Sequence, residues 1–179
     1  MNKDEIRKKY KKLRAENSSN IEVNKIYDKN IVSSIKKFLL LGEYKSVGIY
    51  YPILGEPNIL EILKIENINF SLPKITEDNN ILFYSYKFGN KLIKKDNKLI
   101  YEPTDTKPHC IPEVLLIPGI AFSKNGFRIG FGSGHYDKYL SKNKSTIAVG
   151  VCYSYQITEF KNDSFDIKMN KIITEIEKS

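Results

Sequence analysis

The chain has 179 residues, the length of one domain and enough to bury roughly 70% of its unfolded surface without a disulfide or a metal. Hydrophobic residues make up 41% of it and charged residues 28%, the balance of a soluble globular protein. The charged first ten residues give no sign of a secretory signal, and no apolar run approaches the roughly 18 residues of a membrane span. We therefore expect a cytoplasmic protein.

The net charge of +8 suggests nucleic-acid binding at first sight, but the kind of charge argues against it. Only Arg7, Arg14 and Arg128 are arginines among 29 basic residues, and the lysines are spread along the chain. Nucleic-acid readers favour clustered charge and arginine forks. We expect no nucleic-acid partner, although a diffuse positive field would attract small anions.

The two cysteines, Cys110 and Cys152, lie far apart and form no CxxC motif. A disulfide framework or a zinc site is therefore not expected. Both cysteines are predicted to be small buried hydrophobic residues.

Two amphipathic helices are predicted at the N-terminal end. Asn2 and Glu5 have the pattern of a capping box ahead of a helix over residues 2–17. Ser19 and Glu22 repeat that pattern, and an apolar face at helical spacing follows.

The rest of the chain alternates between predicted strands and helices, which indicates an α/β domain with a mainly parallel sheet. Residues 114–117 have the continuous apolar character of a buried parallel strand, whereas residues 81–102 resemble antiparallel hairpins around Asp96-Asn97. We expect a single domain over residues 1–179. The other predicted elements are strands at 47–51, 70–72, 146–152 and 171–174, a short helix over 58–65 capped by Asn58 and Glu61, and a helix that begins within 126–140.

A glycine-rich segment, Gly126 to Leu140, follows the buried strand and leads into that last helix. Its glycines leave backbone N–H groups unshielded, and the helix N-terminus adds a positive dipole end, which together suit a phosphate group. Arg128 adds a charged fork, and Asp137 places a carboxylate where it could hold Mg²⁺ against phosphate oxygens. The spacing matches neither a P-loop nor a dinucleotide fingerprint, so a tight connector without ligand remains an alternative.

The segment resembles the signature of the 5-formyltetrahydrofolate cyclo-ligases, also called methenyltetrahydrofolate synthetases. That signature runs roughly P-G-x-A-F-D-x-x-G-x-R-L-G-x-G-x-G-Y-Y-D-R-x-L. The matching residues are Pro118, Gly119, Ala121, Phe122, Gly126, Arg128, Gly130, Gly132, Gly134, Tyr136, Asp137 and Leu140.

The resemblance extends along most of the chain, although it is dense only in the signature. The flanking similarities are a basic N-terminal helix with Lys3, Arg7 and the run from Lys11 to Arg14, Tyr50-Tyr51-Pro52 followed by Glu56, Leu72-Pro73-Lys74, Glu102-Pro103, and Asp166 before the last strand. Four positions depart from the family pattern. Ser123 and Glu113 replace Asp, His135 replaces the first Tyr of the signature, and Lys138 replaces Arg.

The resemblance implies an enzyme with a three-layer α/β/α fold of the NagB/RpiA/CoA-transferase-like type. The implied reaction converts 5-formyltetrahydrofolate and ATP to 5,10-methenyltetrahydrofolate, ADP and phosphate, with Mg²⁺ as the cofactor. The γ-phosphoryl group would activate the formyl oxygen, and N10 would then attack the formyl carbon. Such a reaction needs positioning and charge stabilisation rather than a nucleophilic Ser or Cys.

The resemblance also implies roles for individual residues, in a monomer that acts on small molecules without a nucleic-acid or membrane partner. Lys74 could meet an acidic tail of the substrate, although a solvated lysine is the simpler interpretation. The implied catalytic residues are Arg128 and Tyr136; the implied ATP site comprises Lys3, Arg7, Arg128, Gly130, Gly132, Ser133, Gly134, His135 and Tyr136; the folate site comprises Tyr51, Glu56 and Tyr136; and the metal ligands are Asp137 and Asp166.

Two other functions remain open from the sequence. One is a sugar-phosphate isomerase or CoA-transferase-like enzyme on the same fold, which would act without ATP. The other is a nucleotide- or RNA-binding relative without catalytic activity, suggested by the net charge and the departures at Ser123 and His135. RNA binding that weakens steeply with added salt would support the latter.

Overall fold

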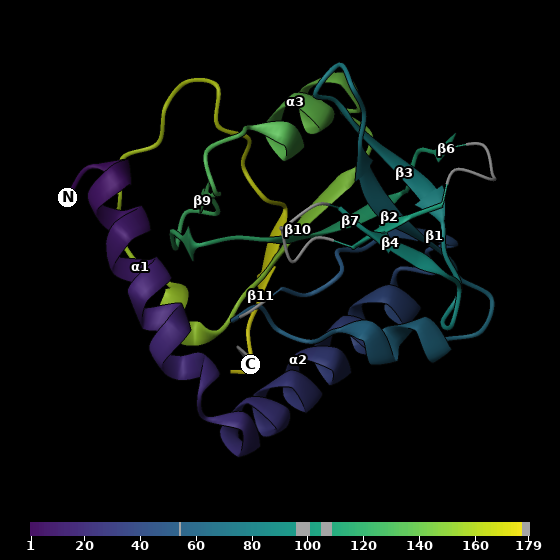
Figure 1. Cartoon of the computed structure of the whole chain (residues 1–179), viewed down its shortest axis with the longest axis horizontal. Coiled ribbons are helices and arrows are strands. Elements are labelled where there is room, and N and C mark those ends of the chain that lie inside the picture. Colours follow the sequence, from purple (N-terminus) through teal and green to yellow (C-terminus); the bar gives the residue numbers. More distant parts are fainter. Residues whose placement is uncertain (54, 96–100, 105–108, 177–179) are drawn as a thin grey trace.

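The computed structural model describes residues 1–53, 55–95, 101–104 and 109–176. Its main sheet has the strand order β11-β10-β7-β1-β2-β3-β6 (Figure 1). The five strands from β11 to β2 run parallel, and β3 and β6 are antiparallel to their neighbours. The predicted mainly parallel sheet is therefore confirmed. The strands are β1 (Ser46–Gly48), β2 (Asn69–Ile75), β3 (Ile81–Ser85), β6 (His109–Cys110), β7 (Val114–Pro118), β10 (Ile147–Val151) and β11 (Lys171–Ile173).

Strand β7 lies inside the sheet, between β10 and β1, and its residues from Val114 to Ile117 are fully buried. This is why its sequence is continuously apolar rather than alternating. Val114 is in register with both Val47 and Ile147, so the three strands end at the same edge of the sheet. In open parallel sheets, ligands bind at the carboxyl ends of the strands. The segments that follow β1 and β7 therefore emerge together at the edge where a site is expected.

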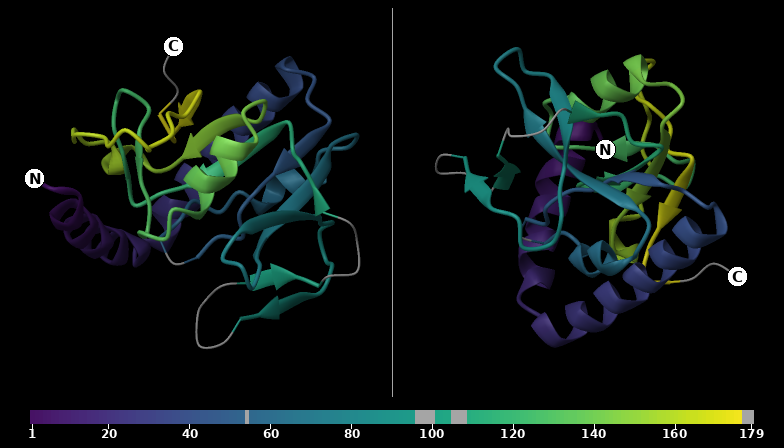
Figure 2. Two further views of the ribbon diagram at one scale, coloured as in Figure 1. Left: turned by 90° about the horizontal axis from the view of Figure 1, so that it is seen from above. Right: turned by 90° about the vertical axis from the view of Figure 1, so that its right-hand side faces the viewer.

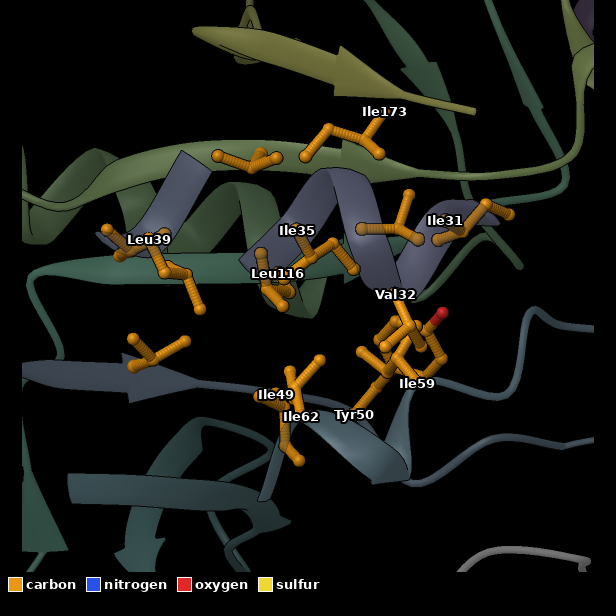
Figure 3. Packing of buried hydrophobic residues seen from close by; sticks show 14 of the residues in the cluster. Ile31, Val32, Ile35, Leu39, Ile49, Tyr50, Ile59, Ile62, Leu116 and Ile173 are labelled. Carbon is orange, nitrogen blue, oxygen red and sulfur yellow. The ribbon is translucent and has the colours of Figure 1, made fainter. Parts of the chain in front are cut away.

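Helices cover both faces of the sheet. On one face α2 (Ile21–Leu41) packs Ile35 and Leu39 against a cluster that includes Leu116 of β7 (Figure 3). On the other face α3 (His135–Lys142) packs Leu140 into a cluster with Leu115. Because neighbouring residues of a strand point to opposite faces, Leu115 packs on the α3 side of the sheet and Leu116 on the α2 side. The arrangement of helix, sheet and helix agrees with the expected layers.

Helix α1 (Lys3–Ser18) lies beside the segments that follow β7 (Figure 1). Its residues Ile6 and Tyr10 are buried in a separate cluster with Ile120, Ala121 and Ile129. The predicted capping box is confirmed. The side chain of Asn2 accepts a hydrogen bond from the Glu5 N–H, and the Glu5 carboxylate accepts one from the Asn2 N–H, both at 2.9 Å.

The predicted cap of the second helix is wrong. Helix α2 begins at Ile21 with Asn20 at its N-cap, and no side chain caps it. Ser19 belongs instead to the end of α1, where its N–H donates to the Glu16 carbonyl. The short helix predicted over residues 58–65 is present as the 3-10 helix η1 (Leu60–Lys64). Its predicted cap is wrong, because Ile59 is the N-cap and no side chain caps it, although Asn58 accepts a hydrogen bond from the Leu60 N–H.

Two strand boundaries differ from prediction. Strand β1 ends at Gly48 instead of continuing to residue 51, and β2 runs through Pro73 instead of stopping before it. Strand β1 pairs with β2 only at Asn69–Ser71. Proline is tolerated at position 73 because no β1 residue there needs an N–H donor from β2.

Antiparallel pairs occur where hairpins were predicted. Strand β3 pairs with β2, and β4 (Leu92–Lys94) pairs with β5 (Tyr101–Pro103) in a hairpin that projects from the main sheet (Figure 2). Asp96 and Asn97 lie outside the described residues. Among the helices that the structure describes, none is long and apolar enough to cross a membrane. Both cysteines are free thiols, and Cys152 is buried as predicted, whereas Cys110 is half-buried.

Candidate active site at the glycine loop

We define the glycine loop as residues 126–134. A short hairpin that was not predicted lies just before it and overlaps its first residues. Strand β8 (Ala121–Phe122) pairs with β9 (Arg128–Ile129), and Ser123 makes the turn between them. The buried Ser123 hydroxyl accepts a hydrogen bond from the Phe127 N–H at 3.1 Å. Ser123 therefore supplies the acceptor that stabilises this turn, and the Asp expected from the family pattern is not needed for that purpose.

The remainder of the loop is open to solvent and leads directly into α3. Gly132 and Gly134 have φ of +112° and +66°, which favour glycine, and nothing lies within 4 Å of where a Cβ would stand on either. Gly134 is the N-cap of α3 and has no side chain to cap it. The first N–H groups of α3 and its positive dipole end therefore lie next to an accessible loop, as expected for a phosphate site.

Arg128 stands at the base of this loop and is only 8% exposed. Its Nη2 lies 2.7 Å from the Asp137 Oδ2, and its guanidinium carbon lies 5.3 Å from the ring centroid of Tyr136. Within the described structure its Nε is buried and has no hydrogen-bond partner. A Cβ on Gly130 would come within 2.8 Å of the Arg128 Nη1, so this glycine leaves room for the guanidinium. Arg128, Tyr136 and Asp137 are thus brought together as predicted.

The two basic residues predicted on α1 reach two different segments. The Arg7 Nε donates a hydrogen bond to the Gly130 carbonyl at 3.1 Å, so Arg7 lies on the glycine loop. The Lys3 Nζ lies 2.6 Å from Asp163 and 2.5 Å from Asp166, in the segment before β11. Burial lowers the pKa of Lys3, but the hydrogen bonds to Asp163 and Asp166 outweigh it and raise the pKa.

The two predicted metal ligands lie near each other but are each paired with a cation. Asp137 bonds to Arg128, and its Oδ1 accepts a 3.4 Å hydrogen bond from the N–H of Ile167, the residue after Asp166. Asp166 pairs with Lys3. Among the described residues no group of three or more His, Cys, Asp or Glu side chains could hold a metal by itself. Mg²⁺ needs only one or two carboxylates when phosphate oxygens supply other ligands, and these two fit that limited role.

The predicted folate residues follow β1. Glu56 is buried, its Oε1 lies 3.5 Å from the Arg14 Nη2, and its Oε2 accepts a 3.1 Å hydrogen bond from the Ile53 N–H. Burial raises the pKa of Glu56 to about 7, although the Arg14 charge opposes this shift. The Glu56 charge in turn adds to the effect of burial in raising the pKa of Tyr136. Glu56 and Tyr136 of α3 are therefore close enough to interact electrostatically.

Tyr51 is half-buried, and its ring pairs with that of Tyr101 in the β4–β5 hairpin at a centroid distance of 5.0 Å. Lys74 lies in β2, opposite Leu82 of β3, and is half-buried. Tyr51 and Glu56 are thus near each other in the chain but have different partners.

Comparison with known proteins assigns the family. The family model described as "5-formyltetrahydrofolate cyclo-ligase family" matches residues 1–175. The chain belongs to the 5-formyltetrahydrofolate cyclo-ligase family. A Mycoplasma genitalium protein named 5-formyltetrahydrofolate cyclo-ligase is 33% identical over 152 residues, which cover 82% of each chain. A Haemophilus influenzae protein of the same name is 25% identical over 183 residues, 96% of each chain.

Solved structures support the same assignment. The Aquifex aeolicus 5,10-methenyltetrahydrofolate synthetase has a TM-score of 0.82 and 31% identity, covering 99% of this chain and 91% of its own. The Mycoplasma pneumoniae 5,10-methenyltetrahydrofolate synthetase has a TM-score of 0.76 and 25% identity, covering 98% of this chain and all of its own. This cyclo-ligase family member therefore shares the fold of known methenyltetrahydrofolate synthetases.

Three contacts at the site of this cyclo-ligase family member were missed from the sequence. Arg14 lies against Glu56, and His135 bonds through its Nε2 to the Asn79 Oδ1 at 2.7 Å and through its Nδ1 to the Ser133 Oγ at 3.0 Å. The spacing of Arg14 four residues after Tyr10 places it on the buried face of α1, a signal that was available. No local signal pairs His135 with Asn79, which lies 56 positions away.

Two hollows lie outside the cluster around Arg128. A groove of about 880 Å³ lies along β11 and the C-terminal end of α2, and none of the predicted site residues lines it. A smaller pocket of about 340 Å³ is bordered by His135, Lys138 and His109. Arg128, Tyr136 and Asp137 line neither of these hollows.

Replacing Glu56 by glutamine is expected to change how stability depends on pH. With a pKa raised to about 7, the folded state binds the Glu56 proton more tightly than the unfolded state does. The stabilisation from this proton is complete below about pH 4.5 and is lost as the pH rises through about 7. The melting temperature of Glu56→Gln, relative to that of the wild type, should therefore be higher at pH 8 than at pH 5.

Glu113→Gln is the matched control. Hydrogen bonds from the Lys45 and Ser46 N–H groups lower the pKa of Glu113, so this carboxylate is ionised at both pH values. Its loss should lower the melting temperature similarly at pH 5 and pH 8. A Glu56→Gln effect that is equally independent of pH would contradict the raised pKa.

Proposed function

We propose that this chain converts 5-formyltetrahydrofolate and ATP to 5,10-methenyltetrahydrofolate, ADP and phosphate. The family assignment supports the reaction class, and one observation ties it to particular residues. The buried guanidinium of Arg128, with an unpartnered Nε among the described residues, stands beneath an open glycine loop at a helix N-terminus. That combination suits a phosphoryl group whose charge changes during transfer.

The chemistry needs activation because a formamide oxygen is a poor leaving group. Transfer of the γ-phosphoryl group forms a bond from phosphorus to the formyl oxygen and breaks the bond to the β-phosphate, which releases ADP. N10 then attacks the formyl carbon and loses its proton, while the carbon–oxygen bond breaks and phosphate leaves with that oxygen. Formyl carbon, N5 and N10 then form the methenyl bridge.

Several residues of the chain have roles in this proposal. Arg128 and the backbone of Gly130, Gly132, Ser133 and Gly134 bind the phosphates, with His135 bordering the loop and fixing it to Asn79. Arg7 orients the loop through the Gly130 carbonyl. Lys3 adds positive charge on the side of Asp163 and Asp166.

On the folate side, Glu56 is proposed to accept hydrogen bonds from polar N–H groups of the pterin, and Tyr51 to contact its ring. The Tyr136 ring contacts Arg128, and the Glu56 charge raises the pKa of Tyr136, so Tyr136 is proposed to contact both substrates. Mg²⁺ would be held by phosphate oxygens with Asp137 and Asp166, and would neutralise charge on the phosphates. We further propose that the chain acts as a cytoplasmic monomer on these small molecules.

The direct test is incubation with 5-formyltetrahydrofolate, ATP and Mg²⁺ while the absorbance of the methenyl product is followed. Product is expected only when ATP is present, with one ADP released for each turnover, and chelation of Mg²⁺ should slow the reaction. Absence of product with folded protein, or equal product without ATP, would contradict the proposed function.

A further inference from the structure

Arg14 is a buried charge in α1 that the proposed reaction does not yet use. It follows Ile6 and Tyr10 on the buried face of the helix, and its side chain is only 5% exposed. A buried arginine is costly unless it is paired. Its neighbours therefore indicate what it does.

On one side Arg14 contacts the segment that follows β1. Its Nη2 lies 3.5 Å from the Oε1 of Glu56, whose side chain is 4% exposed. A Cβ on Gly55, which has a φ of +75°, would lie 3.0 Å from the Arg14 Cβ and 3.1 Å from its carbonyl oxygen. The backbone before Glu56 is therefore fitted closely against Arg14, and the carboxylate is held by the guanidinium.

On the other side Arg14 contacts the glycine loop. Its guanidinium carbon lies 5.3 Å from the ring centroid of Phe131, which stands between Gly130 and Gly132 and is 50% exposed. Lys11, one turn earlier on α1, approaches the same ring at 5.6 Å. Arg14 therefore contacts both the Glu56 carboxylate and the loop proposed to hold phosphate.

We propose that Arg14 is a positioning residue that couples nucleotide binding at the glycine loop to folate binding at Glu56, through its simultaneous contacts with Phe131 and the Glu56 carboxylate. This inference rests on the proposed function. When a phosphate group binds the loop, it also fixes the position of Phe131. The Arg14 guanidinium packs against that ring, so it is fixed in turn and holds the Glu56 carboxylate in one orientation. Because binding free energies are linked, folate must tighten nucleotide binding by the same factor.

The coupling is measured by titration calorimetry on the full chain. The Kd for 5-formyltetrahydrofolate is determined with and without a saturating non-hydrolysable ATP analogue and Mg²⁺, and the ratio of the two values is the coupling factor. We expect a ratio of at least about 5 in the wild type, within the usual range of allosteric coupling. Arg14→Lys keeps the charge but loses the planar fork, and Phe131→Leu keeps apolar bulk but loses the ring. Each should bring the ratio close to 1, and for Arg14→Lys the Kd for the analogue alone should change less than about threefold.

Lys11→Ala is the matched control because Lys11 contacts the same ring without contacting Glu56. Its ratio should equal that of the wild type. Circular dichroism checks folding, and Phe131→Leu, at an exposed residue, tests the coupling even if Arg14→Lys does not fold.

Three results would overturn the inference in distinguishable ways. A wild-type ratio of 1 with both ligands bound, or an unchanged ratio in folded Arg14→Lys or Phe131→Leu, contradicts the coupling alone. A wild type that binds neither ligand contradicts the proposed function and the coupling together. The assay needs no turnover, so an inactive chain that still shows the expected ratios supports the coupling while contradicting the reaction.

Discussion

Replacing Arg128 by alanine is expected to lower kcat for the cyclo-ligase reaction by about 10²–10³-fold, the usual loss when one charge-stabilising donor is removed from an active site. Arg128 is buried at the base of the glycine loop, and its Nε has no hydrogen-bond partner among the described residues, so it keeps unused donor capacity. The loss should appear in kcat more than in KM for folate, because the transferring phosphoryl group needs the charge most in the transition state. Steady-state kinetics with both substrates varied measures this split.

Arg128→Lys is the companion variant, because it keeps the positive charge and loses the fork that reaches Asp137. We expect its kcat to lie between those of Arg128→Ala and the wild type. Circular dichroism and melting temperature establish that each variant is folded. A folded Arg128→Ala with near wild-type kcat would mean that the reacting phosphate binds elsewhere.

Replacing Gly132 by alanine is expected to raise KM for ATP by more than about tenfold without unfolding the chain. The φ of +112° at Gly132 is disfavoured for any residue with a Cβ, at a cost of about 1–3 kcal/mol. The exposed loop relieves this strain by changing conformation, which redirects the N–H groups proposed to bind phosphate. Folate affinity measured without nucleotide should stay within about twofold of wild type.

Gly89→Ala is the matched control for this strain. Gly89 has a φ of +86° and nothing lies within 4 Å of its Cβ position, as at Gly132, but it lies in the turn between β3 and β4. Its replacement should cost similar stability and leave KM for ATP unchanged. If both variants alter KM equally, the effect comes from general destabilisation and not from the loop.

The fold was largely predictable because its main elements have local signals. The capping box at Asn2 and the continuous apolar run of β7 each specify one element within a few residues, and both predictions are confirmed. The two-residue strands β8 and β9 were missed because two residues are too few to show alternation. Strand β2 continues through Pro73 because its neighbour β1 has ended, which depends on the sheet and not on the local sequence.

The proximity of the central signature residues was predictable, but most other contacts at the candidate site were not. The signature placed Arg128, Tyr136 and Asp137 together, and the structure joins them. No local pattern pairs Asp166 with Lys3 or Glu56 with Arg14, because each pair joins residues from separate elements. Whether these residues bind ATP, folate and Mg²⁺ stays a prediction for the experiments above.

The position of α1 has a consequence for how the protein is made. Lys3 bonds to Asp166, 163 positions later in the chain, and Arg7 bonds to Gly130, 123 positions later. These two bonds of α1 can therefore form only after more than 120 further residues have emerged from the ribosome. Until residues 120–129 have been made, its apolar side, with Ile6 and Tyr10, lacks the residues it packs against, and nascent chains are vulnerable to association during this interval. The capping box of α1 uses only residues at its own start, so the helix can begin to form while it waits for the rest of the chain.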